Sequence, residues 1–177
     1  MLRLGLMTAA FCLALVTSSS TFAQAPENPN DAVPDAMPFD VPYGESISID
    51  DAKKVAAAAV AEAKKHGNWK LCITIVGPSG DLLYFERMDG AQLASIQISQ
   101  HKARASARFR RPTLAFEQAM GRGQFFTYLG TLDDIVASRG GNPLVVNGKL
   151  VGAIGVSGGT GSQDDVVSKA GVAALGK

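Results

Sequence analysis

The sequence is poor in the residues that build disulfides and metal sites. Its 177 residues include two cysteines and two histidines, and no histidine pair has the H-x-x-H or H-E-x-x-H spacing of zinc enzymes. Cys12 lies in a segment that we expect to be removed, so Cys72 has no partner for an intrachain disulfide. Cys72 stands in the apolar run 71–76, which is typical of a buried strand. These features exclude a disulfide scaffold and argue against a dedicated zinc enzyme.

The sequence also lacks an excess of charge and a long hydrophobic run. The formal net charge is +1, and it falls to zero once Arg3 is removed with the N-terminal segment. A nucleic-acid-binding protein would show a basic excess. The longest apolar run, 4–16, is shorter than the roughly 20 residues that cross a bilayer. We therefore expect neither a nucleic-acid partner nor a membrane span in the mature protein.

The first 46 residues divide into two segments that precede the folded domain. Arg3, the apolar run and the small residues up to Ala23 form the pattern of a secretory signal peptide at 1–23. This predicts a periplasmic or secreted protein. Residues 24–46 hold five of the eight prolines, so we expect an extended arm, either dangling or lying across a neighbouring subunit. Residues 47–177 form the predicted domain, which is long enough to bury its own core.

The domain alternates helices with strand pairs. The alanine-rich segment that Ser48 or Asp50 would cap predicts a first helix that Gly67 ends. Asn147-Gly148 between two apolar runs predicts a two-residue hairpin. Because hairpins join the strands, we predict an α+β fold with a mostly antiparallel sheet flanked by helices. The further predicted elements are strands at 70–77 and 82–88 and helices at 92–110, 113–121 and 162–175.

The helix predicted at 92–110 carries a polar stripe between two apolar faces. At about 100° per residue, one face holds Leu93, Ile96, Ala103 and Ala107, and the other holds Ala94, Ile98, Ala105 and Phe109. Two apolar faces predict that the helix is covered on both sides, by the sheet and by something else, which in a single small domain is often another subunit. The stripe itself consists of Gln97, His101, Arg104 and Arg108.

This stripe suits a flat apolar ligand that carries a metal and carboxylates. His101 would approach the metal, and Arg104 and Arg108 would bind the carboxylates. A solvated basic stripe is the alternative. The second histidine, His66, lies at the end of the first helix, where the helix dipole favours a cation without any further function.

A glycine-rich loop precedes the last helix. Backbone N–H groups of Gly158, Gly159 and Thr160 would bind an anion. The loop lacks the lysine of a phosphate-binding P-loop, and a simple turn followed by an N-cap is the alternative. Asp164 and Asp165 in the first helical turn complement the helix dipole and would repel an anion.

Two segments carry a distinctive pattern, DGAxLxSIxISxxKAxxSAxFxRPT at 89–113 and GGxPLVVxGxLVGAIGVSGGTxxQDxxxxxAG at 140–171. Together they resemble the haem-degrading HbpS-like family, which includes the GlcG proteins and the C-terminal domain of PduO. The resemblance covers about residues 46–175 and implies a profilin-like domain, like that of GlcG, that forms homo-oligomers. It also implies haem as a cofactor or ligand, with His101 at a position that the pattern leaves open and Tyr84, Thr113 and Tyr128 as other candidate axial ligands.

Two functions follow from these features. The first is an exported protein that binds haem or a related tetrapyrrole through His101, Arg104 and Arg108, for storage, sensing or haem breakdown. The second is a small-molecule enzyme, or an accessory protein of a periplasmic hydroxy-acid or alcohol oxidation system, with its site at the Gly158–Ser162 loop and at arginines of a subunit interface. A third interpretation, an interaction protein that docks a partner through the arm, rests on composition alone.

Overall fold

The first helix follows the sequence prediction closely. A computed structural model describes residues 27–67 and 69–175, so the predicted signal peptide lies outside the described residues. Helix α1 spans Ile49–Lys65, and the Ser48 hydroxyl accepts a hydrogen bond from the backbone N–H of Asp51 at 3.1 Å. Gly67 has a φ of 83°, the left-handed conformation with which many helices end.

The sheet has four strands in the order β2-β1-β4-β3, and every neighbouring pair is antiparallel. Strand β1 spans Cys72–Val76, β2 spans Leu82–Arg87, β3 spans Gly141–Val146 and β4 spans Lys149–Ser157. Asn147 and Gly148 both have positive φ values, 49° and 73°, as a two-residue hairpin requires. The predicted α+β class, antiparallel sheet and hairpin are therefore confirmed, and Cys72 is fully buried in β1.

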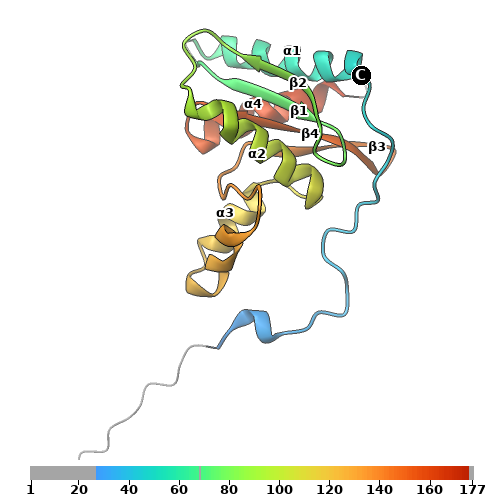
Figure 1. Ribbon diagram of the computed structural model, residues 1–177, viewed down its shortest axis with the longest axis vertical. Coiled ribbons are helices and arrows are strands. Elements are labelled where there is room, and N and C mark those ends of the chain that lie inside the picture. Colours follow the sequence, from blue (N-terminus) through green and yellow to red (C-terminus); the bar gives the residue numbers. More distant parts are fainter. Residues whose placement is uncertain (1–26, 68, 176–177) are drawn as a thin grey trace, which may run out of the picture.

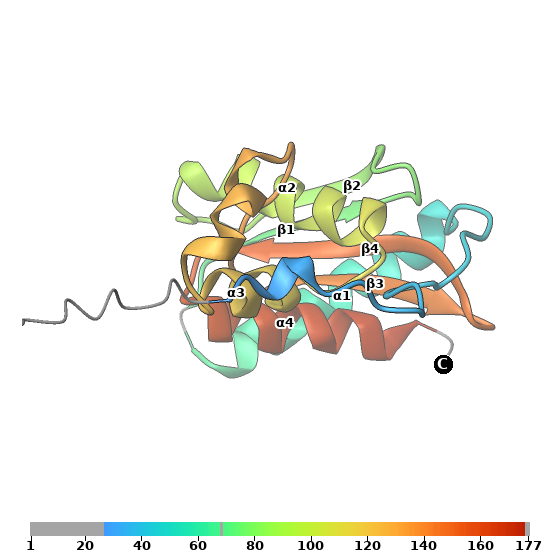
Figure 2. The same ribbon diagram turned by 90° about the horizontal axis from the view of Figure 1, so that it is seen from below.

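Helices cover both faces of this sheet (Figures 1 and 2). Helix α1 and the last helix, α4 (Gly161–Ala174), pack on one face, and α2 (Ala94–Arg108) packs on the other. The main core lies between the sheet and the α1–α4 layer. It includes Val55, Ile73, Ile75, Ile154 and Val167, all with no exposed surface.

The contact of α2 with the sheet differs from the sequence prediction. Leu93, predicted on a packed face, is 72% exposed, and the buried side of α2 consists mainly of serines and alanines. The reason is a close approach of two backbones: a Cβ at Gly155 of β4 would collide with the carbonyl oxygen of Ser99 and lie 2.5 Å from the backbone nitrogen of Ala103. Only small side chains fit at this spacing. The buried small residues of α2 are Ser95, Ser99, Ala103, Ala105, Ser106 and Ala107.

The C-terminal half of the second apolar face of α2 is covered by the same chain. Ala105 and Phe109 pack against Phe116 of α3 (Leu114–Met120) and Leu129 of the 3₁₀ helix η2 (Gln124–Thr131). At Ala105 and Phe109 the cover that the sequence argument left to something other than the sheet therefore comes from the same chain, whereas Ala94 is exposed. The homo-oligomer itself stays a prediction.

The arm runs along the edge of its own domain (Figure 1). Its C-terminal part pairs with β4: Gly44 N–H donates to the carbonyl of Leu150 at 2.8 Å, and Leu150 N–H donates to the carbonyl of Pro42 at 2.8 Å. Near its start, at the short 3₁₀ helix η1 (Pro29–Asp31), the Asn30 side chain donates to the carbonyl of Phe125 at 2.9 Å. The arm therefore contacts both the sheet and the segment that contains η2.

Candidate functional site

The predicted polar stripe lies on the side of α2 that faces away from the sheet. We call the outer face of α2 the set Leu93, Ala94, Gln97, His101, Arg104 and Arg108. His101 is half-buried, and no described residue forms a hydrogen bond or an ion pair with it. An imidazole that is partly shielded from water and engages no protein group is available to an external ligand.

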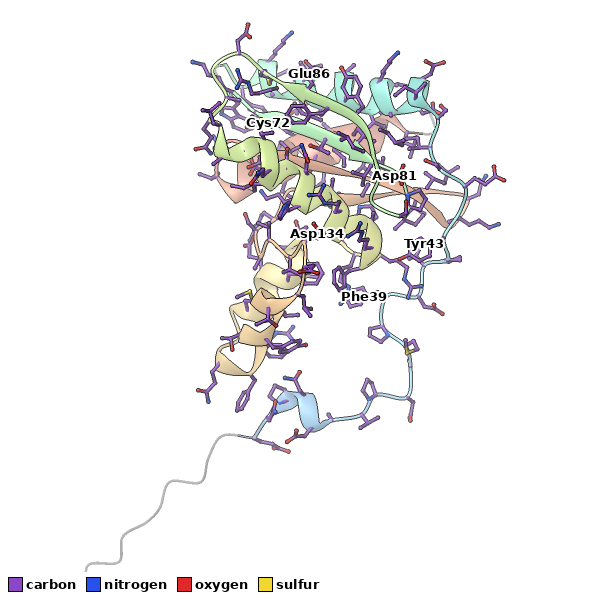
Figure 3. All side chains as sticks on the ribbon, viewed as in Figure 1. Phe39, Tyr43, Cys72, Asp81, Glu86 and Asp134 are labelled. Atoms are coloured by element: carbon purple, nitrogen blue, oxygen red, sulfur yellow. The ribbon has the colours of Figure 1, made fainter. Side chains whose placement is uncertain are left out.

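The two arginines of this face share one carboxylate that sequence reasoning missed. Arg104 Nε lies 2.9 Å from Oδ1 of Asp134, and Arg108 Nη1 lies 2.5 Å from Oδ2 of the same residue. Arg108 Nε also donates to the carbonyl of Ser79 at 2.9 Å. Figure 3 shows Asp134 beside α2. Two guanidinium groups against one carboxylate leave a net positive charge and unused N–H donors on this face.

Two of the other candidate axial ligands are engaged inside the protein. Tyr84 donates to Glu86 at 3.0 Å, and this hydrogen bond raises the pKa of the Tyr84 phenol, which keeps it protonated. Thr113 is fully buried, and its hydroxyl accepts the N–H of Gly141 at 2.9 Å. Tyr128 on η2 is 50% exposed. Of these three residues, Thr113 is fully buried, Tyr84 is half-buried and Tyr128 is exposed.

A buried ion pair lies beneath the outer face of α2. Lys102 Nζ lies 2.8 Å from Oδ2 of Asp164 and donates to the carbonyl of Val156 at 3.2 Å. The side chains of Lys102 and Asp164 are 2% and 3% exposed. Burial raises the pKa of Asp164, whereas Lys102 and the N–H of Gly159 act in the opposite direction. This pair joins α2 to the start of α4, and the sequence argument used neither residue as a site.

Two of the three predicted amides of the glycine-rich loop are engaged within the protein. The N–H of Gly159 donates to Oδ1 of Asp164 at 3.0 Å, and the N–H of Thr160 donates to Oε1 of Gln163 at 2.8 Å. The Thr160 hydroxyl in turn accepts the N–H of Gln163, which completes a capping box. Gly158, with a φ of 146°, forms the turn before this cap. These contacts agree with the alternative of a turn followed by an N-cap, and the amides of Gly159 and Thr160 already have acceptors within the protein.

No cluster of three or more His, Cys, Asp or Glu side chains that could hold a metal ion occurs within 27–67 and 69–175. In the same residues, no helix is long and apolar enough to cross a bilayer. The thiol of Cys72 is buried, and burial raises its pKa, so it is a poor nucleophile and metal ligand.

Comparison with known families identifies the fold. The family model described as "Haem degrading protein HbpS-like" matches residues 47–173. The chain belongs to the HbpS-like family. This confirms the resemblance drawn from 89–113 and 140–171, and the matched range coincides with the domain formed by the sheet and its helices.

Relatives in the HbpS-like family include proteins of known sequence and of known structure. Protein GlcG of Escherichia coli K12 is 40% identical over 111 residues, which is 63% of this chain and 81% of GlcG. A 15.0 kDa protein of Citrobacter freundii, from the dhaT-dhaS intergenic region, is 35% identical over 126 residues, 70% of this chain and 88% of that protein.

Solved structures share the same fold. A double mutant of Streptomyces reticuli HbpS superposes with a TM-score of 0.70 at 27% identity, over 82% of this chain and 98% of HbpS. A structure described as a PduOC:heme complex superposes with a TM-score of 0.68 at 25% identity, over 74% of this chain and 96% of PduOC. PduOC thus has this fold and is bound to haem in that structure.

Proposed function

We propose that this protein is exported and binds haem or a related tetrapyrrole on the outer face of α2, with His101 as the iron ligand. The observation that carries the proposal is the half-buried His101 imidazole, which engages no described residue, within a family described as haem-degrading. The haem complex of the PduOC neighbour supports the choice of ligand.

The chemistry of the outer face fits one side of a haem group. His101 would hold the iron of a bound haem through an imidazole nitrogen. Leu93 and Ala94 are exposed and offer apolar contact to a porphyrin ring. Arg104 and Arg108 retain N–H donors beyond those that Asp134 takes, so they can bind a propionate. The residues present therefore fit haem.

The other side of the ring needs a second surface. The outer face of α2 is one side of a single helix, whereas binding sites enclose most of a ligand's surface. A second copy of the chain would supply this cover, which agrees with the predicted homo-oligomer. The contacts of the outer face serve binding and orientation, so we assign a role in haem binding, such as storage or sensing, ahead of catalytic breakdown.

The decisive experiment is a titration of the mature protein with hemin, followed at the Soret band. We expect saturable, stoichiometric binding with a sharp, shifted band. His101→Ala should abolish the shift and weaken binding by about tenfold or more, as expected for loss of an axial ligand. His66→Ala is the matched control because it removes the other histidine, which stacks on Trp69 and contacts Glu62 at 3.0 Å. An unchanged spectrum and affinity in His101→Ala would refute the ligand assignment.

Export rests on the N-terminal segment of the sequence and has its own test. Mass spectrometry of protein from a periplasmic fraction should find a chain that begins after Ala23. An intact N-terminus in the cytoplasmic fraction would refute export and leave the haem proposal untouched.

The alternative of a small-molecule enzyme with its site at the glycine-rich loop loses its main support. The amides that would hold a carboxylate donate instead to Asp164 and Gln163.

A further inference from the structure

A cavity lies where the arm meets α3 and η2, away from the outer face of α2. Its volume is about 290 Å³, and it combines aromatic rings with guanidinium groups. Figure 3 shows Phe39 of the arm close to the C-terminal end of α2, at one wall of this cavity. The aromatic and cationic lining residues are Phe39, Arg111, Phe116, Arg122, Phe126 and Tyr128.

Arg111 is a half-buried cation without a carboxylate partner among the described residues. The centre of its guanidinium lies 3.7 Å from the ring centroid of Phe39 and 5.5 Å from that of Phe116. Its Nε donates to the carbonyl of Phe109 at 2.9 Å. Burial, together with the charge of Arg110, lowers the pKa of Arg111. An anion in the cavity would offset this unfavourable burial.

Arg122 supplies a second uncompensated charge to the same cavity. Its guanidinium lies 5.9 Å from the ring centroid of Phe126, and it has no carboxylate partner within the described chain. Two carboxylates of this region are committed elsewhere: Glu117 binds Arg139 at 2.5 Å, and Asp40 lies 3.4 Å from Arg110. The cavity therefore carries two positive charges that no carboxylate of the described residues neutralises.

The backbone around the cavity is held in an unusual conformation. Phe39 and Arg110 have φ values of 59° and 54°, in the left-handed region that is costly for residues with large side chains. In this conformation the Phe39 ring stacks on the guanidinium of Arg111. Such strain concentrates at binding and catalytic sites.

We propose that this cavity binds a small planar aromatic carboxylate, with its carboxylate on Arg111 and Arg122 and its ring among the phenylalanines. Guanidinium groups recognise carboxylates through paired hydrogen bonds, and aromatic walls favour a flat ring. The volume of about 290 Å³ is at the lower end of the roughly 300–1,000 Å³ of ligand pockets, so the ligand has one or two rings and is smaller than haem. This site is separate from the outer face of α2 and does not depend on the haem proposal.

The test is a calorimetric titration of haem-free mature protein with benzoate and, separately, with 2-naphthoate. Benzamide and acetate are the comparison ligands, because the first lacks the charge and the second lacks the ring. We expect saturable, one-to-one binding of at least one aromatic carboxylate, with affinities about tenfold or more weaker for benzamide and acetate.

Variants locate the site. Arg122→Gln is the main variant because Arg122 is exposed and its loss should leave the fold intact; we expect a loss of affinity of about tenfold. Arg111→Gln should have at least the same effect, with circular dichroism as the check on folding. Arg87→Gln removes the same charge from β2 and is the matched control, and His101→Ala should leave carboxylate binding unchanged. Absence of saturable binding, equal binding of benzamide, or full affinity in Arg122→Gln would each overturn the proposal.

Discussion

Lys102 and Asp164 offer the sharpest test of the packing beneath α2. Lys102→Met keeps the length of the side chain and removes its charge. In the native protein the two charged atoms lie 2.8 Å apart, with side chains 2% and 3% exposed. The variant therefore leaves the Asp164 carboxylate buried, with the N–H of Gly159 as its remaining hydrogen-bond donor in the described structure.

The expected loss of stability follows from the cost of an unpaired buried charge. Removing one partner of a buried ion pair costs about 3–5 kcal/mol of unfolding free energy. For a domain of this size each 1 kcal/mol shifts the melting temperature by about 2–4 °C. Lys102→Met should therefore lower the melting temperature by roughly 6–20 °C. Two-state urea unfolding with an unchanged m value would attribute the change to stability.

A second variant and a pH series separate charge from packing. Lys102→Met with Asp164→Asn removes the stranded charge and keeps an oxygen for Gly159, so most of the lost stability should return. Burial raises the pKa of Asp164, and the loss of Lys102 raises it further. The Asp164 carboxylate then binds a proton more readily in the folded state than in the unfolded state. The unfolding free energy that Lys102→Met loses relative to the wild type should therefore become smaller as pH falls. A single-variant loss below about 1 kcal/mol, or one insensitive to pH, would refute the reasoning.

Two further predictions concern Glu117 and Gly155. Hydrogen bonds from Arg139 lower the pKa of Glu117. The ionised Glu117 therefore stabilises the fold above its unfolded pKa of about 4.3, and this contribution is lost as pH falls through its lower folded pKa. Acid unfolding of Glu117→Gln, followed by circular dichroism, should depend less on pH than that of the wild type. Gly155→Ala places a methyl group against the carbonyl of Ser99 and should cost about 1–3 kcal/mol or more in urea unfolding, whereas a neutral effect would contradict the close approach of α2 to β4.

Local sequence signals predict most of the fold. Gly67 and the Asn147-Gly148 pair each require a backbone conformation that few residues adopt, and both mark element ends correctly. The face of α2 that packs on the sheet was harder to predict, because Ser95 and Ser99 contribute little to a hydrophobic pattern. Their burial depends on Gly155, far later in the chain, which hydropathy does not connect to them.

The site was less accessible to sequence reasoning because its contacts join distant segments. Asp134 lies in 122–139, where no periodicity indicates which helix it meets, yet it binds Arg104 and Arg108. Asp164 is explained locally by its place in the first turn of α4, and nothing near it indicates Lys102, which lies 62 residues away in the chain. The helical spacing of the α2 stripe nevertheless placed His101 and both arginines on one face.

The two sides of α2 account for different properties of the protein. The family pattern at 89–113 specifies four residues that are buried against the sheet or the start of α4: Ser95, Ser99, Lys102 and Ala103. His101 occupies an open position of that pattern and lies on the outer face. At these four positions the resemblance thus reflects how α2 packs against the sheet and α4, whereas a ligand on the outer face would meet His101, Arg104 and Arg108, which the pattern does not specify, beside Leu93, which it does. The haem ligand of this chain therefore has to be tested on His101 itself, since membership of the family does not determine it.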